Sequence, residues 1–164
     1  MNKQPIGERI IRFQDCDPYG HLNNSKYLDY MINVREDHLI HEYDINIFEM
    51  AQVQKKAWVV GHNDLIYMRP ALVMEKVKVK TAMIDFNDRY VQAEMIMTNE
   101  AETHIKAVLW TKFYHFDIAQ QRGIRHTEEQ MELFKEMMLL VEQQSTEERA
   151  KHLATALKVA VPSE

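Results

Sequence analysis

Runs of apolar and β-branched residues alternate with polar connections along most of the chain. Five such runs are typical of strands, at residues 7–13, 52–68, 73–84, 89–98 and 104–116. After the first of them, apolar residues recur at helical spacing and predict one long helix over residues 25–41. The order of strand, helix and four strands favours an α+β domain in which the sheet wraps around the helix.

Glycine, proline and asparagine separate or interrupt the predicted strands. Gly61–Asp64 predicts a bulge or bend within the second strand, and Pro70 ends that strand because proline has no N–H to donate to a sheet. The pairs at residues 87–88 and 99–100 predict the turns of an antiparallel meander. Residues 44–51 are predicted to be a connector.

The two faces of each predicted strand indicate how the sheet is covered. Residues 73–84 carry a row of lysines, for which we favour a solvated face over a phosphate site: Lys76, Lys78 and Lys80. In residues 89–98, Gln92 and Glu94 form the polar face. Residues 104–116 are apolar on both faces, so both faces should be covered. Because one helix covers only one face, we expect a dimer.

Polar residues also occur at special positions of the predicted long helix. Arg35 and His38 fall on or near its apolar side. We interpret both as hydrogen-bonded groups at the rim of the core, with a catalytic role as the alternative. Asn24 or Ser25 can serve as the N-cap of this helix.

Two further helices are predicted after residue 120. Thr127 and Gln130 have the spacing of a capping box, and apolar residues follow at helical intervals. A second helical pattern opens at Ser145, and its apolar face holds Ala150, Leu153, Leu157 and Ala160. We therefore expect a domain over residues 1–120 and a C-terminal helical extension over residues 121–164.

Bulk composition narrows the class of protein. The 164 residues carry a formal net charge of -5, which argues against a nucleic-acid partner. A single cysteine excludes an internal disulfide framework. The sequence shows no apolar leader and no apolar run of the ~20 residues that a membrane span needs. We therefore expect a cytoplasmic protein.

The densest group of polar residues lies in the loop Phe13–Asn24, directly before the long helix. This loop holds two carboxylates, an imidazole and two amides, at Asp15, Asp17, His21, Asn23 and Asn24. Acidic and imidazole groups beside a helix N-terminus can move protons next to free backbone N–H donors. An Asx turn that only caps the helix is the competing interpretation.

Metal binding by the same loop is less favoured. A calcium loop would need a bidentate glutamate where Lys26 stands. A site built from Asp15, Asp17 and His21 lacks a second cluster of ligands at suitable spacing. We therefore expect no metal.

The loop and the helix start also resemble a known family. The pattern Phe13-x-Asp15-Cys16-Asp17-Pro18-x-Gly20-His21-x-Asn23-Asn24-x-x-Tyr27-Leu28 resembles that of hotdog-fold acyl-CoA thioesterases of the 4-hydroxybenzoyl-CoA thioesterase type. The stretch Ile66-Tyr67-x-Arg69-Pro70-Ala71 resembles a strand end in the same family. The resemblance covers residues 5–118 and implies a five-stranded antiparallel sheet around one long helix, with chains paired as homodimers or dimers of dimers.

The resemblance further implies a reaction and roles for the loop residues. Asp17 would be the catalytic carboxylate, as a nucleophile on the thioester carbonyl or as a general base for water. His21 and Asn23 would orient the water or polarise the carbonyl, while backbone N–H groups at the helix start hold the oxyanion. The substrate-binding residues would be Gly20, Leu22, Asn24, Ser25 and Tyr27. No cofactor is implied.

The implied substrate is a fatty acyl-CoA, because the stretch from His21 to Asn24 is closer to fatty acyl thioesterases than to the hydroxybenzoyl enzyme. One alternative is a hydrolase acting on acyl-carrier-protein thioesters. Another is a non-catalytic hotdog module that binds acyl-CoA or an acyl carrier. A third is a structural or regulatory dimer that uses residues 121–164 as a partner surface. An enoyl-CoA hydratase is less favoured, because its Asp/His pair is spaced differently.

Overall fold

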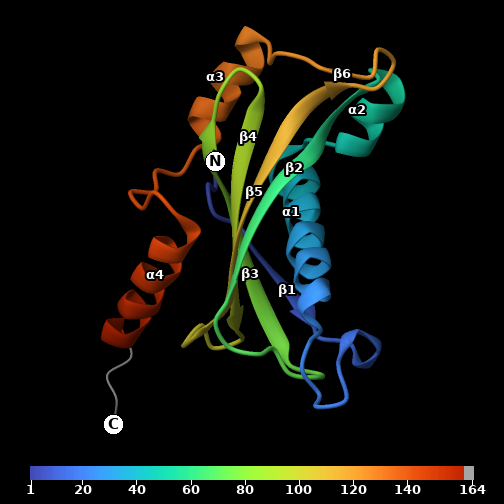
Figure 1. Cartoon of the computed structure of the whole chain (residues 1–164). Helices are drawn as coiled ribbons and strands as arrows, with labels where there is room; N and C mark the ends of the chain where they lie inside the picture. The colour runs from blue at the N-terminus through green and yellow to red at the C-terminus, as the bar shows by residue number, and fades with distance from the viewer. Residues whose placement is uncertain (161–164) are drawn as a thin grey trace.

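One curled antiparallel sheet with helices on both sides makes up the computed structural model, which describes residues 1–160 (Figure 1). The strands are β1 (Ile6–Ile10), β2 (Lys56–Tyr67), β3 (Lys76–Phe86), β4 (Tyr90–Asn99), β5 (Ile105–Asp117) and β6 (Arg122–Gly123). Their order across the sheet is β1-β3-β4-β5-β2, with the short β6 beside β5. The predicted five strands around one long helix are confirmed, and β6 is an addition that the sequence pattern did not predict.

Helices lie on both faces of this sheet. On the inner face, α1 (Tyr27–Tyr43) packs against β1, β3, β4 and β5. On the outer face, α4 (Thr146–Ala160) packs against β5 and β2. Two shorter helices complete the chain: α2 (Ile47–Val53) contacts β2, and α3 (Glu128–Met137) contacts β3. Figure 1 shows α1 and α4 on opposite sides of the sheet.

The core has an inner and an outer part. The inner cluster joins α1 to the sheet and includes Met31, Val34, Val77, Met95 and Leu109. The outer cluster joins α4 to the sheet and includes Ala82, Ile96, Val108, Ala150, Leu153 and Leu157. Both apolar faces of β5 are therefore covered within one chain. The face whose cover was expected from a partner chain is therefore covered by α4, and the dimer itself stays a prediction.

The two predicted C-terminal helices are confirmed as far as they fall within the described residues. Thr127 Oγ1 accepts from the Gln130 N–H, and the Gln130 side chain accepts from the Thr127 N–H, which is the predicted capping box. The side chain of Ala160 and residues 161–164 lie outside the described residues. Within the described chain, no helix is both long and apolar enough to cross a membrane.

Two predicted boundaries near the N-terminus shift for local reasons. The first strand ends at Ile10 rather than at residue 13, because the Arg12 N–H donates to Tyr30 Oη at 2.9 Å instead of to a strand. The long helix begins at Tyr27, after a 3-10 turn over Asn24–Lys26.

The predicted connector over residues 44–51 was wrong, because α2 begins inside it. Asn46 Oδ1 accepts hydrogen bonds from the N–H groups of Phe48 and Glu49 and thereby caps this short helix. As a consequence β2 begins at Lys56 rather than at residue 52.

Within the sheet, the bulge and the lysine row follow the predictions. The register of β2 against β5 shifts between Val60 and His62, inside the sequence where a bulge or bend was expected. The lysines of β3 pair with acids, as in Lys76–Glu100 at 2.9 Å and Lys80–Glu102 at 2.6 Å. Lysines already paired with carboxylates support the solvated-face interpretation.

Candidate active site

The loop between β1 and α1 folds back on itself. The Asp17 N–H donates to the His21 carbonyl at 2.8 Å, and the Gly20 N–H donates to the Asp17 carbonyl at 3.0 Å. Gly20 has a φ of 76°, which glycine adopts without steric cost. This turn places Asp17 and His21 beside each other at the start of the segment that enters α1.

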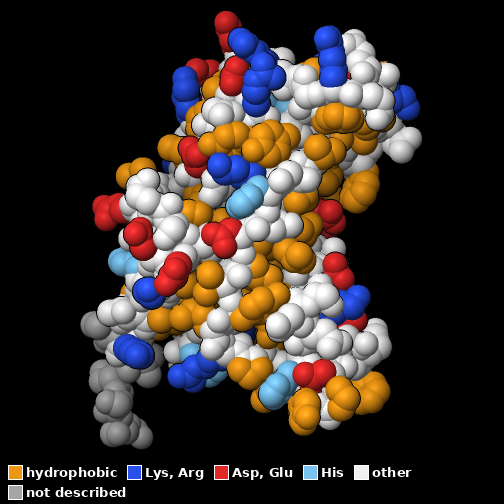
Figure 2. Space-filling view, in the orientation of Figure 1, with side chains coloured by type: hydrophobic (Ala, Val, Ile, Leu, Met, Phe, Trp, Pro, Cys, Tyr) orange, Lys and Arg blue, Asp and Glu red, His pale blue; other side chains and the backbone are white. Residues whose placement is uncertain are grey.

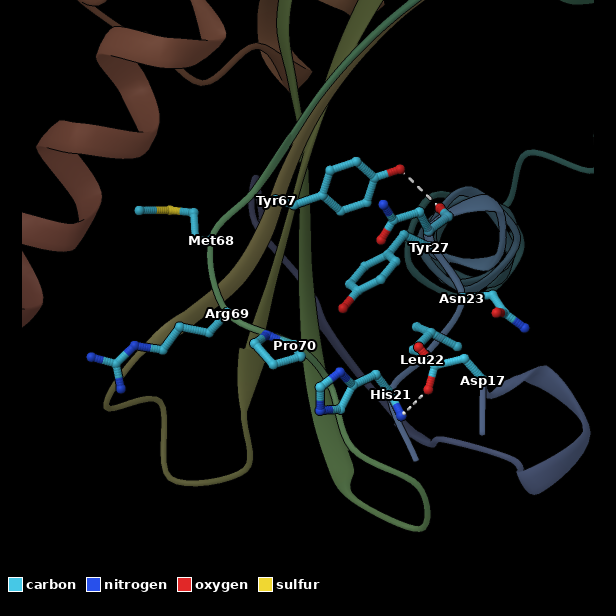
Figure 3. Close-up of a pocket in the computed structure, with 10 residues that line it drawn as sticks. Asp17, His21, Leu22, Asn23, Tyr27, Tyr67, Met68, Arg69 and Pro70 are labelled. Carbon is cyan, nitrogen blue, oxygen red and sulfur yellow. Dashed lines mark hydrogen bonds between the residues drawn. The ribbon is translucent and has the colours of Figure 1, made fainter. Parts of the chain in front are cut away.

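One oxygen of the Asp17 carboxylate holds this turn together. Asp17 Oδ1 accepts from the N–H groups of Tyr19 at 2.9 Å and His21 at 3.0 Å, and the second bond is drawn in Figure 3. Asp17 Oδ2 accepts no hydrogen bond from the described residues. Oδ1 therefore forms an Asx turn within the loop and does not cap the helix, while Oδ2 remains available for chemistry.

The second carboxylate of the loop lies in a different environment. Asp15 Oδ2 accepts from Tyr30 Oη at 2.7 Å, and Asp15 lines a separate cavity that it shares with Lys26. The two acids of the motif therefore do not converge. Within residues 1–160, no three His, Cys, Asp or Glu side chains come together in a way that could hold a metal ion.

Asp17 lines a cavity of about 570 Å³ that lies between the loop, the start of α1 and the end of β2 (Figure 3). Its lining residues are Asp17, His21, Leu22, Asn23, Asn24, Tyr27, Tyr67, Met68, Arg69 and Pro70. Six of the eight predicted site residues thus share one cavity. Among its lining residues from the described chain, only Asp17 carries a carboxylate. The other two, Gly20 and Ser25, are not part of the lining.

The helix start at this cavity is uncapped. Neither Asn23, which precedes the 3-10 turn, nor Lys26, which precedes α1, accepts a capping hydrogen bond. The predicted capping by Asn24 or Ser25 was wrong, because their side chains accept no hydrogen bond from the described residues. Their own backbone N–H groups also find no acceptor there. Asn24, a lining residue with a free N–H, and the positive end of a helix dipole therefore lie at the cavity wall.

Two tyrosines fix the helix start against the end of β2. Tyr67 Oη donates to the Asn24 carbonyl at 2.9 Å, as drawn in Figure 3. Tyr27 Oη accepts from the Ala71 N–H at 3.0 Å, and the two tyrosine rings meet edge to face at 5.2 Å. Burial raises the pKa of Tyr27, so its hydroxyl stays protonated.

Sequence reasoning assigned no role to the end of β2, although it provides four cavity residues, Tyr67 to Pro70. The available signal was the stretch Ile66–Ala71, which resembles a recurring strand end and whose residues had no predicted role. The pairing of β2 with β5 sets where this stretch ends in space, and the sequence alone does not show that position.

Comparison with known proteins gives consistent matches. A family model described as the thioesterase-like superfamily matches residues 11–157, a range that includes α3 and most of α4. The long-chain acyl-CoA thioesterase FadM of Escherichia coli is 23% identical over 128 residues, which are 78% of this chain and 95% of that protein.

Solved structures show the same fold. The probable thioesterase YbaW of Escherichia coli superposes with a TM-score of 0.69 at 22% identity, covering 81% of this chain and 97% of that one. A 1,4-dihydroxy-2-naphthoyl-CoA thioesterase from Synechocystis superposes with a TM-score of 0.72 at 13% identity, covering 80% and 96%. This similarity confirms the predicted hotdog architecture.

Proposed function

Because the chain belongs to the thioesterase-like superfamily, we propose that it hydrolyses the thioester of a fatty acyl-CoA to a free acid and coenzyme A. The observation that carries the proposal is that Asp17, with one free carboxylate oxygen, shares a cavity with an uncapped helix start. Thioester hydrolysis needs a group that attacks the carbonyl or activates water, and it needs donors for the negative charge that develops on oxygen.

The loop prepares Asp17 for either of two chemical roles. Its Oδ1 is held by two backbone N–H groups, so the carboxylate is fixed without help from the substrate. As a nucleophile, Oδ2 bonds to the thioester carbon and expels the thiolate, and water then opens the mixed anhydride. As a general base, Oδ2 takes a proton from the water that attacks the same carbon.

The remaining predicted residues support this step. The N–H groups of Asn24 and Ser25 are assigned to the oxyanion, because they have no other acceptor in the described chain. His21 and Asn23 line the same cavity and are assigned to orient water or polarise the carbonyl. Leu22 and Tyr27 contribute apolar surface for the acyl group. Gly20 is assigned to shaping the loop.

A fatty acyl group is favoured for two reasons. The relative FadM is described as a long-chain acyl-CoA thioesterase. The cavity wall also includes apolar surface from Leu22, Met68 and Pro70.

A second copy of the chain is the partner that we assign to the free edge of the sheet. Within the described residues β2 pairs only with β5, so its other edge is open. Val59, Val60 and Tyr67 of β2 and the following Met68 are exposed. Figure 2 shows hydrophobic side chains gathered down the middle of this face. Exposed apolar edge strands invite pairing, and a homodimer, alone or as a dimer of dimers, would cover this one. Sedimentation of Val60→Lys tests it, with a monomer expected.

The catalytic role is tested by replacing the two loop acids in parallel. Release of free thiol from a panel of acyl-CoAs is measured for the wild type, Asp17→Asn and the matched control Asp15→Asn. Asparagine keeps the Oδ1 acceptor, so the turn should survive. We expect Asp17→Asn to lose about 10²- to 10⁴-fold in turnover and Asp15→Asn to stay within several-fold of wild type. Unchanged turnover in Asp17→Asn would remove Asp17 from the chemistry.

The Asx turn around Asp17 also favours one alternative, a non-catalytic module that binds acyl-CoA or an acyl carrier. In that case Asp17 would only stabilise the turn of the loop through its hydrogen bonds. The same panel, extended with an acyl-carrier-protein thioester, separates the possibilities. Binding without thiol release from any member would favour the module, and release from the carrier thioester alone would identify a carrier-specific hydrolase.

A further inference from the structure

A second cavity of about 180 Å³ lies between α1, the sheet and α3, beyond the candidate active site. Apolar side chains from helices and strands dominate its wall, among them Ile32, Leu39, Trp58, Met83, Phe113 and Met137. Three polar residues share the lining, which are Arg35, Glu36 and Gln92. The cationic side chain of Arg35 is unusual in so apolar a wall.

Arg35 is buried without a counter-ion. Only 5% of its surface is exposed, and no carboxylate of the described residues lies within 4 Å of its guanidinium. It donates to Thr81 Oγ1 at 3.4 Å, an oxygen that also bonds His38 Nδ1 at 2.8 Å, and the Tyr43 hydroxyl is a second uncharged partner. The guanidinium stacks 5.6 Å from the Tyr43 ring centre. A guanidinium has five N–H donors, and none of those of Arg35 meets a carboxylate of the described residues.

This burial is costly for a charged group. Desolvation lowers the pKa of Arg35 from its usual value, but an arginine remains protonated at neutral pH. Buried charges are ordinarily paired, because an unpaired one loses its hydration without compensation. Glu36 lines the same cavity without pairing with Arg35, and burial followed by the charge of Asp37 raises the Glu36 pKa.

The second cavity lies further along α1 and β2 than the first, and the two share no lining residue. Tyr27 lines the first cavity, and Ile32 and Arg35 line the second, one to two turns further along α1. The rise from Tyr27 to Arg35 is about 12 Å. On β2, Tyr67 lines the first cavity and Val60 and Trp58 line the second. An extended acyl chain that starts at Asp17 would therefore point toward Arg35.

On the premise of the proposed thioesterase function, we propose that the preferred acyl group ends in a carboxylate that pairs with Arg35. The substrate class is then an ω-carboxyacyl thioester, the monothioester of a dicarboxylic acid. A plain alkyl end would leave the buried guanidinium unpaired, whereas a carboxylate matches its planar fork with two parallel hydrogen bonds. Arg35 determines specificity in this scheme and takes no part in the chemistry at Asp17.

Chain-matched substrates test the pairing. Values of kcat/KM are measured for octanoyl- and decanoyl-CoA and for the ω-carboxylated suberoyl- and sebacoyl-CoA. We expect wild type to prefer the carboxylated member of each pair by about 10- to 100-fold. Arg35→Met should abolish this preference and should fold, because an apolar residue often replaces a buried charge without loss of stability. Arg35→Lys should keep part of the preference, and the exposed Arg122→Met should keep all of it.

A binding measurement keeps the inference separate from the catalytic proposal. Trp58 lines the cavity, so its fluorescence reports occupancy by free sebacate or decanoate. We expect wild type to bind sebacate more tightly than decanoate and Arg35→Met to lose this difference. Hydrolysis with an equal or reversed preference, unchanged in Arg35→Met, would overturn the inference and leave the proposed function intact. Absence of hydrolysis would overturn the proposed function, and the fluorescence comparison would then decide the inference alone.

Discussion

Glu94 on β4 and Arg149 on α4 form a buried, bidentate ion pair that ties the C-terminal helix to the sheet. Arg149 Nε donates to Glu94 Oε2 at 2.8 Å, and Arg149 Nη2 donates to Glu94 Oε1 at 2.9 Å. Glu94 is fully buried and also accepts from Trp110 Nε1 at 2.9 Å. Both carboxylate oxygens are therefore satisfied by donors from α4 and β5.

Replacing Arg149 with methionine should destabilise the fold by about 3–5 kcal/mol, because the buried Glu94 carboxylate would lose its cation. Urea unfolding followed by circular dichroism measures the loss. The double variant Arg149→Met with Glu94→Leu should recover most of it, since no buried charge remains. Lys151→Met, which breaks the exposed pair with Glu147, is the control and should leave the midpoint unchanged. Equal midpoints for wild type and Arg149→Met would contradict this view of the pair.

The proposed division of the chain at residue 120 has a testable consequence. Removing residues 121–164 would uncover the outer face of the sheet, where Ile96, Val108 and Trp110 now pack under α4. It would also leave Glu94 without Arg149. We expect the shortened chain to aggregate or to unfold cooperatively at much lower urea. A shortened chain that stays soluble with native circular dichroism and thiol release would show that residues 1–120 are self-sufficient.

His115 predicts a pH dependence of stability. Its ring stacks on Trp58 at 4.6 Å, and its Nε2 is buried without a partner among the described residues. Burial first, and then the neighbouring His126, lower its pKa from 6.5 to about 4. As the pH falls from 6.5 to about 4, His115 takes up a proton in the unfolded chain and stays neutral in the folded chain. Stability is therefore fully present above this window and falls by about 3 kcal/mol across it.

Urea unfolding at several pH values in this window checks the contribution of His115. The variant His115→Phe keeps a ring in the stack and removes the titrating group. We expect the stability of this variant to fall less steeply with pH than that of the wild type. Parallel curves for the two proteins would mean that His115 is not the group that titrates.

Alternation along the strands predicted the sheet but could not show what covers it. Glu94 and Gln92 fall on the polar face of β4. The structure buries Glu94 completely because α4, more than 50 positions later in the chain, brings Arg149 onto that face. The residue pattern within one strand does not show a partner that comes from a distant helix. The same holds for Arg35 and His38, whose common neighbour Thr81 lies on β3.

The predicted site residues that share a cavity are close in sequence. Asp17, His21 and Asn23 belong to one loop, so a short motif places them on one cavity. The opposite wall comes from the end of β2, and only the fold brings it there. The helix α2, which was not predicted, is short and is capped by the Asn46 side chain.

Tyr67 provides the most direct test of that opposite wall. Its hydroxyl donates to the Asn24 carbonyl at 2.9 Å and so holds the helix start whose N–H groups are assigned to the oxyanion. Tyr67→Phe removes this bond and keeps the edge-to-face contact with Tyr27. A lost hydrogen bond of about 0.5–1.5 kcal/mol corresponds to a decrease in kcat of up to about 10-fold.

The kinetic pattern separates positioning from stability in this variant. Because Tyr67 is half exposed, the variant should unfold at a urea midpoint close to wild type while kcat falls and KM changes little. The matched control is Tyr114→Phe, an equally exposed tyrosine on β5 that lies outside the cavity. It should leave both constants unchanged. A wild-type kcat for Tyr67→Phe would show that the helix start keeps its position without this bond, and equal losses in both variants would point to a general effect on the sheet.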